Sequence, residues 1–266
     1  MYALAISDGV PRMLNPLDYP VLVLLVSIIV FAGAGWMGGS LRDKKPDLER
    51  DHEEFKFVLG ATLTLLGLII GFSFSMAVTR YDQRKDYEEA EANALGTEYV
   101  RADLLPAADA GKVRSLLKNY LDLRIRTYRT RSREQLREMD AQTARLQSQL
   151  WSAVAVPANA QQSLMVLLVV AGMNDVLNSQ GYTQAAWWNR IPTGAWILMS
   201  TISFFCNFLI GYSARQRGLL LYLILPIALS VSLFLIAEID SPRSGLIRVH
   251  PQNLEALAKS LDSQTP

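Results

Sequence analysis

Four long stretches of this chain contain no Asp, Glu, Lys, Arg or His. They are Tyr19–Leu41, Phe57–Thr79, Ile191–Ala214 and Gly218–Ala237. The apolar core of a bilayer is about 30 Å thick, so roughly 20 helical residues cross it, and each stretch is long enough. A helix also satisfies its own backbone hydrogen bonds in lipid. Any one stretch could be a buried helix of a soluble protein, but four in 266 residues predict four transmembrane helices.

The first stretch has an alternative interpretation as a cleaved signal peptide. Its apolar part is longer than the usual h-region of about 7–15 residues, and Arg12 is the only basic side chain before it. We therefore expect a retained membrane anchor. The single cysteine, Cys206, lies within the third stretch, so the chain cannot form an intramolecular disulfide.

The spans divide the chain into five segments. Residues 1–18 form an N-terminal segment, 19–79 the first helix pair, 80–190 a domain outside the bilayer, 191–240 the second helix pair and 241–266 a C-terminal tail. An even number of spans places both termini and the domain on the same side. Lys and Arg flank the spans about equally on both faces, so the positive-inside rule does not choose that side.

The domain between the two pairs is predicted to be helical throughout. One stripe at spacings of three and four comprises Leu136, Met139, Thr143, Leu146 and Leu150. No alternating polar and apolar pattern predicts a strand, and helix breaks are expected at Pro106, near Ser132 and at Pro157. The apolar run Leu164–Met173 is too short to span the bilayer, so we expect a helix buried within the domain.

The second stretch has no helix breaker after Thr79, and Tyr81–Leu105 is rich in Ala and Glu. A single helix of about 50 residues, running from the bilayer into the domain, is therefore predicted. Taken together, these patterns predict an all-α membrane protein with four transmembrane helices and a helical extramembrane domain between the second and third.

The residues that catalysis or metal binding would need are missing from the sequence. The two histidines, His52 and His250, lie far apart, and there is no CxxC or HExxH motif. Metal ligation and Ser-His or Cys-His catalysis therefore lack their parts. No glycine-rich phosphate loop follows a strand, so we expect no enzyme, no cofactor, no metal and no nucleic-acid partner.

Transport coupled to protons usually needs ionisable groups within the membrane, and the four stretches contain none. The two halves of the chain also show no repeat of the kind that many secondary transporters have. The spans therefore favour passive conduction, signalling or scaffolding over a secondary transporter.

The second stretch carries the most informative pattern. At about 100° per residue, one arc of about 80° comprises Thr64, Leu68, Phe72 and Ser75. A neighbouring strip of small residues comprises Gly60, Gly67 and Gly71. One interpretation is a helix-packing seam, in which the glycines admit another helix. The other is that several copies of this helix surround an axis, with Leu68 and Phe72 closing an apolar constriction.

A second candidate is basic. Spacings of three and four would place four arginines on one helix face: Arg126, Arg129, Arg133 and Arg137. The ordinary interpretation is a solvated face, but such a cluster would also attract small anions or acidic lipid heads. A third feature, Glu238 and Asp240 at the end of the fourth stretch, reads as a pair of interfacial acids, because calcium would need more oxygen ligands.

Three sequence elements resemble the bestrophins, a family of pentameric anion channels, as do the order of the spans and the place of the helical domain. GFSFSMAVTRYDQRKDYEEA, from Gly71 to Ala90, is similar to their second transmembrane helix. MNDVLNSQGYTQAAWWNRIPTGAWILM, from Met173 to Met199, is similar to the entry into their third span. IAEIDSP, from Ile236 to Pro242, resembles the pattern after the fourth. Bacterial proteins with a bestrophin-like domain resemble the chain over most of its length.

The resemblance implies a homopentamer around a central pore in a bacterial inner membrane, with the domain and both termini cytoplasmic. It assigns the neck of that pore to Thr64, Leu68 and Phe72, and a second, cytosolic constriction to Leu164. Calcium-activated bestrophins carry an acidic run after the fourth span, whereas this chain has SPRSGLIRV there, so the resemblance does not extend to calcium gating.

The leading hypothesis is thus a pentameric, anion-selective channel. Its expected partners are the lipid bilayer, further copies of the chain and small inorganic anions. The alternative is a non-conducting membrane receptor or scaffold whose helical domain binds a partner.

Overall fold

The computed structural model describes residues 16–44, 52–160, 163–213 and 219–263. The N-terminal residues, the charged loop after the first span and the turn between the last two spans lie wholly or mostly outside these ranges. Eight α-helices and two short 3₁₀ helices make up nearly all of the described residues, which contain no strand. The expected all-α architecture is therefore confirmed.

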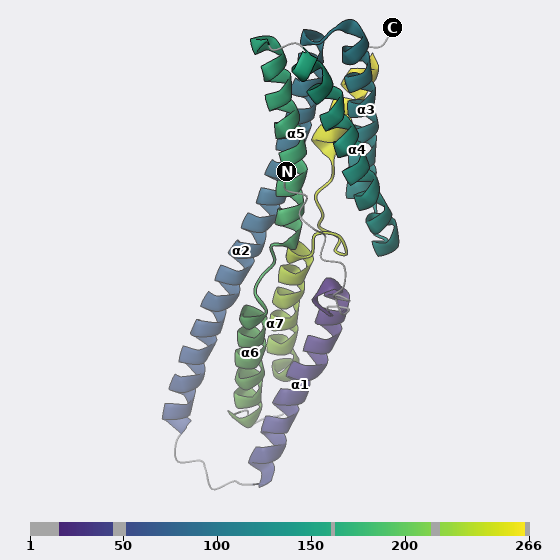
Figure 1. Cartoon of the computed structure of the whole chain (residues 1–266). Helices are drawn as coiled ribbons and strands as arrows, with labels where there is room; N and C mark the ends of the chain where they lie inside the picture. The colour runs from purple at the N-terminus through teal and green to yellow at the C-terminus, as the bar shows by residue number, and fades with distance from the viewer. Residues whose placement is uncertain (1–15, 45–51, 161–162, 214–218, 264–266) are drawn as a thin grey trace. The chain divides into compact units, whose positions relative to one another are not determined.

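The helices follow one another with short connections (Figure 1). The α-helices are α1 (Pro20–Lys44), α2 (His52–Arg101), α3 (Ala107–Arg129), α4 (Arg133–Ala160), α5 (Leu164–Trp188), α6 (Thr193–Ser213), α7 (Leu219–Asp240) and α8 (Gln252–Ser263). The 3₁₀ helices are η1 (Pro16–Asp18) and η3 (Ala102–Leu104). At 50 residues, α2 is the single long helix that the sequence predicts.

The described chain contains four helical stretches that are long and apolar enough to cross a membrane. These are Pro20–Arg42, Phe57–Leu104, Leu164–Ser213 and Leu223–Asp240. Apart from a few residues at their ends, the charge-free stretches found in the sequence coincide with parts of α1, the first half of α2, α6 and α7.

The structure divides into two compact units. One contains residues 1–78 and 191–247, and the other contains residues 79–190 and 248–266, so that α2 contributes to both. We call the first the membrane unit and the second the helical domain. In the membrane unit, α1, α6 and α7 lie side by side (Figure 1).

Two glycines allow α1 and α6 to approach closely. A Cβ atom on Gly38 of α1 would overlap the carbonyl oxygen of Phe208, and one on Gly211 of α6 would overlap that of Gly35. Because the obstructing atoms belong to the backbone, neither position has room for a side chain. These are the small-residue contacts on which helix packing in membranes depends.

The core of the helical domain is formed by α2 to α5 together with α8. Side chains that are almost wholly buried there include Val113, Leu117, Tyr120, Leu150 and Met173. The predicted breaks at Pro106 and near Ser132 are confirmed, because α3 and α4 begin just after them. The break at Pro157 is wrong: α4 continues to Ala160, and Pro157 lies buried in its last turn. A proline removes one backbone donor and does not always end a helix.

Candidate functional site

The candidate neck residues lie on a face of α2 that the chain itself leaves uncovered. Leu68 is 53% exposed and Phe72 is 65% exposed, whereas Leu66 and Ala77 on the opposite face are almost completely buried. Thr64 is exposed as well, and its hydroxyl donates a hydrogen bond of 2.9 Å to the carbonyl of Gly60. This backbone bond satisfies the hydroxyl without a partner from another helix.

The glycine strip beside this face is equally open. A Cβ atom on Gly60, Gly67 or Gly71 would meet nothing within 4 Å. These glycines therefore do not seat another helix of the same chain, in contrast to Gly38 and Gly211. Among the described residues, no helix of the same chain packs closely on this strip, so a packing seam within the described part of the chain does not explain the pattern.

Leu164, the residue assigned to a cytosolic constriction, is the first residue of α5 and is 81% exposed. The helix begins there because the Ser163 side chain accepts a hydrogen bond from the backbone nitrogen of Val166 at 3.2 Å. The first turns of α5 present an exposed apolar surface, which we call the α5 surface. It comprises Leu164, Met165, Leu167 and Leu168.

The expectation that Leu164–Met173 is buried is therefore only half right. Val166, Val169 and Met173 pack into the core of the domain, and the α5 surface faces away from it. An uninterrupted apolar run cannot show which face is buried, because both faces carry the same kind of residue.

The four candidate arginines are all exposed, but they do not share one helix face. Arg126 and Arg129 lie in the last turn of α3, whereas Arg133 and Arg137 lie in the first turns of α4. Because α3 ends at Arg129, spacings counted from α3 into α4 do not predict that residues share a helix face. Arg129 also pairs with Glu255 of α8, at 2.7 Å between Nη2 and Oε1.

A buried charge pair that the sequence analysis did not single out lies at the centre of the domain. Arg124 of α3 is 2% exposed and forms an ion pair with Glu91 of α2, through Nε to Oε1 and through Nη2 to Oε2 at 3.3 Å. The hydroxyls of Tyr128 and Thr183 lie 3.4 Å and 3.2 Å from Oε2 of the same carboxylate. The groups that contact the Glu91 carboxylate of α2 therefore come from two other helices, α3 and α5.

Electrostatics keeps the Arg124 guanidinium charged. Burial alone would lower the pKa of the Arg124 guanidinium, but the adjacent Glu91 carboxylate outweighs it and raises that pKa. Burial also raises the pKa of the Tyr128 hydroxyl, and the Glu91 charge raises it further. The tyrosine therefore stays neutral and acts as a hydrogen-bond donor.

A second buried carboxylate on α2 fixes the start of α8. The Glu88 side chain accepts hydrogen bonds from the backbone nitrogens of Asn253 and Leu254, both at 3.0 Å, and from the Asn253 amide at 2.7 Å. A carboxylate in this position satisfies the free N–H groups of a helix N-terminus and complements its dipole. Burial nevertheless raises the Glu88 pKa above its ordinary value.

The acids at the end of α7 hold the backbone of the membrane unit. Glu238 accepts hydrogen bonds from the backbone nitrogens of Leu246 and Ile247, and Asp240 accepts one from that of Ile191 at 3.0 Å. Both side chains are buried. In the part of the chain that the structure describes, no group of three or more His, Cys, Asp or Glu side chains could hold a metal ion.

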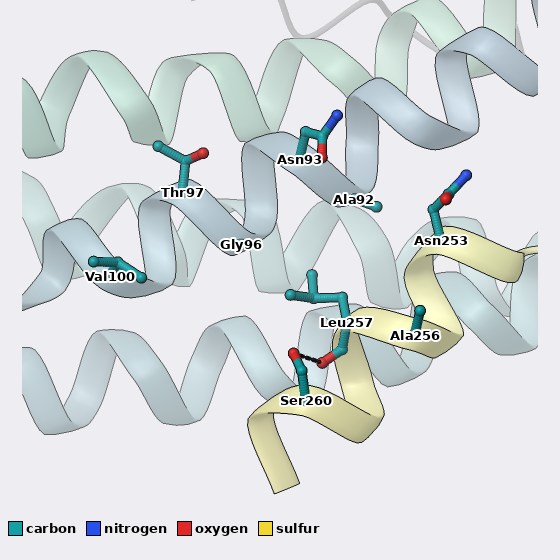
Figure 2. Close-up of a pocket in the computed structure, with 9 residues that line it drawn as sticks. All are labelled: Ala92, Asn93, Gly96, Thr97, Val100, Asn253, Ala256, Leu257 and Ser260. Carbon is teal, nitrogen blue, oxygen red and sulfur yellow. Dashed lines mark hydrogen bonds between the residues drawn. The ribbon is translucent and has the colours of Figure 1, made fainter. Parts of the chain in front are cut away.

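An open groove lies between α2 and α8 in the helical domain (Figure 2). Its lining residues are Ala92, Asn93, Gly96, Thr97, Val100, Asn253, Ala256, Leu257 and Ser260. None of them is an acid or a base, and the Ser260 hydroxyl is bonded to the carbonyl of Leu257 at 2.8 Å. The groove therefore offers surface for contact and no acid–base chemistry.

The fold and these sites define the class: a multi-span, all-α membrane protein with a separate helical domain. The Bestrophin-like domain family matches residues 21–254, and the chain belongs to that family. A comparison with curated protein sequences gives no match.

Solved structures of bacterial bestrophin homologues share the fold. One from Klebsiella pneumoniae, solved by zinc phasing, has a TM-score of 0.62 at 14% identity, covering 92% of this chain and 99% of its own. A single-substitution variant has a TM-score of 0.64 at 13% identity, covering 93% of this chain and 99% of its own. The family and the fold are of a kind that ion channels use.

Proposed function

We propose that this protein is a pentameric ion channel of the bacterial inner membrane, selective for small inorganic anions. The second transmembrane helix forms an apolar neck, with Thr64, Leu68 and Phe72 facing the axis. Leu164 forms a second constriction in the cytoplasmic domain. The observation that carries the proposal is the uncovered face of α2.

Of the four described candidate spans, the one in α2 is the least buried within the chain. In the most apolar part of α2, 11% of the residues are buried within the chain, against 50% in α7. Lipid could cover apolar side chains, but it cannot fill a strip of glycines closely, whereas a neighbouring helix can. Further copies of the chain, seated on Gly60, Gly67 and Gly71, would place α2 near an axis.

The α5 surface supports self-association independently. It lies in the helical domain, where no lipid tail covers it, and exposed apolar surfaces of this kind usually mark contacts between proteins. Copies arranged around an axis would bring their Leu164 side chains together. The exposed Arg126, Arg133 and Arg137 would raise the local concentration of anions near such an assembly.

The same α5 surface, with the groove between α2 and α8, is what favours the second candidate function. In a non-conducting receptor or scaffold, these two surfaces would bind a different protein. A receptor of that kind has no need of five-fold symmetry or of ion flux, so one experiment separates the two functions.

We expect the purified protein to be a homopentamer that passes anions. Native mass spectrometry in several mild detergents should give a particle of five chains, and proteoliposomes should release chloride when a gradient is applied. Monomers or dimers in every detergent would contradict the pore, and pentamers that pass neither chloride nor larger anions would favour the scaffold.

The orientation has its own test, in a background where Cys206→Ala removes the native thiol. A cysteine at Lys45, which lies outside the described residues, should react with a membrane-impermeant thiol reagent in intact cells. A cysteine at the exposed Gln149 of α4 should react only after the cells are opened. The opposite labelling pattern would place the helical domain outside the cytoplasm.

A further inference from the structure

Glu98 of α2 is buried in the helical domain without a hydrogen-bond partner. The residue is 0% exposed, and neither Oε1 nor Oε2 accepts a hydrogen bond from any described residue. Its carboxyl group lies against Gly172 of α5: a Cβ atom added to that glycine would overlap Oε2. The contact between the two helices is therefore closed over the carboxyl group.

The charged groups around Glu98 come from both helices. Arg101, three residues further along α2, has its Nη1 2.6 Å from the same point above Gly172, and its positive charge favours the carboxylate. Asp175, on α5, is exposed, and its negative charge disfavours the carboxylate. Neither makes a salt bridge with Glu98 within 4 Å among the described residues.

An ionised carboxylate in this position would have lost its water and gained no hydrogen bond in return. Such a group takes up a proton instead, because the neutral acid costs far less to bury. Burial, acting against the opposing charge of Arg101, raises the pKa of Glu98 to about 8. Between about pH 4.5 and pH 8, where an ordinary glutamate is mostly ionised, the Glu98 side chain is therefore mostly neutral.

We propose that Glu98 is a proton-binding site that couples pH to the packing of α2 against α5. With the proton bound, the two helices close over the neutral side chain at Gly172. Without it, the carboxylate needs water or a closer approach of the Arg101 guanidinium, and admitting either disturbs the packing of the two helices at Gly172. The α5 surface begins eight residues from Gly172 on the same helix, so this contact sets how firmly that surface is held.

The proposal does not depend on ion conduction, and linkage gives its sign. The pKa of Glu98 is higher in the folded protein than in the opened one, so the stabilisation is complete below about pH 4.5. It is lost as the pH rises towards about 8 and does not change further above that pH. Opening of the α2–α5 contact should increase about tenfold for each pH unit across this window.

The proton itself can be observed by infrared spectroscopy of the full chain in detergent. The spectrum at pH 6, minus that of Glu98→Gln, should contain the C=O band of a protonated carboxyl group, and the band should be absent at pH 9.5. If the subtracted spectrum has no such band at pH 6, the carboxyl is ionised and the proposal is wrong. Should Glu98→Gln fail to fold, the wild-type spectra alone test the proposal: the C=O band of a protonated carboxyl group should be lost between pH 6 and pH 9.5.

The coupling to packing is measured by hydrogen exchange in peptides that cover residues 164–176. Relative to Glu98→Gln, whose amide mimics the neutral acid, opening in the wild type should rise about 100-fold between pH 5.5 and pH 7.5. Glu89→Gln, which neutralises an exposed glutamate on the same helix, should behave like the wild type. Equal pH profiles in the wild type and Glu98→Gln would show that the proton does not control this contact.

Discussion

Replacing Leu68 and Phe72 together by alanine should raise the basal conductance of the protein in planar bilayers severalfold and weaken its discrimination among anions. The two residues lie one helical turn apart, and in a five-fold assembly each forms an apolar ring. Such a ring stops ions because water is unfavourable inside it, and it excludes strongly hydrated ions most. Smaller side chains widen the ring and let water enter.

A matched control lies on the same helix. Leu63→Ala with Phe74→Ala removes the same two types of side chain, but at about 100° per residue these positions point about 120° or more away from both Leu68 and Phe72. This control should leave the conductance unchanged.

If the neck residues instead fill a seam between helices, the double substitution would cost roughly 2–5 kcal/mol per site and reduce the yield of assembled protein. A double variant that assembles normally and conducts no more than the parent would show that Leu68 and Phe72 do not form the gate.

The membrane spans and the length of α2 could be predicted because both depend on local sequence. A charge-free stretch of sufficient length has few stable states outside a bilayer, and a helix continues until a residue such as Pro106 ends it. The same local reasoning was wrong at Pro157, where burial in the core outweighs the loss of one backbone hydrogen bond.

The buried charges of the domain were missed because charged residues usually indicate a solvated face. On α2 the reverse holds, and one buried stripe runs along the helix in the domain and continues into the first residue of η3: Arg84, Glu88, Glu91, Leu95, Glu98 and Ala102. Their spacings alternate between four and three, which is the period of a packed helix face. The sequence therefore did contain a signal for this buried face, because the apolar Leu95 and Ala102 share the spacing of the charged residues.

Contacts between distant residues could not be predicted from local patterns. The sequence does not show that Arg124 meets Glu91, or that Gly38 and Gly211 pack closely while Gly60, Gly67 and Gly71 stay open. The four arginines were grouped on one face because spacing was counted across the end of α3. What covers the open face of α2 cannot be predicted from local patterns either, because the described residues of the chain leave it exposed.

Breaking the buried pair between Arg124 and Glu91 should be the most destabilising single change in the helical domain. Arg124→Met leaves the Glu91 carboxylate buried with only the Tyr128 and Thr183 hydroxyls beside it. Removing one partner of a buried pair costs about 3–5 kcal/mol, because the remaining charge is left uncompensated. We expect a large fall in the midpoint of thermal unfolding, measured for the full chain in detergent.

The exposed pair between Arg129 and Glu255 provides the control, since its arginine side chain is 64% exposed. Arg129→Met should cost no more than about 1 kcal/mol, because water screens a surface ion pair. The double variant Arg124→Met with Glu91→Leu removes both buried charges, so it should recover much of the stability that Arg124→Met loses. If Arg124→Met and Arg129→Met lower the unfolding midpoint equally, the buried pair does not hold α2 and α3 together. The same conclusion follows if the destabilisation of the double variant equals the sum for Arg124→Met and Glu91→Leu measured separately.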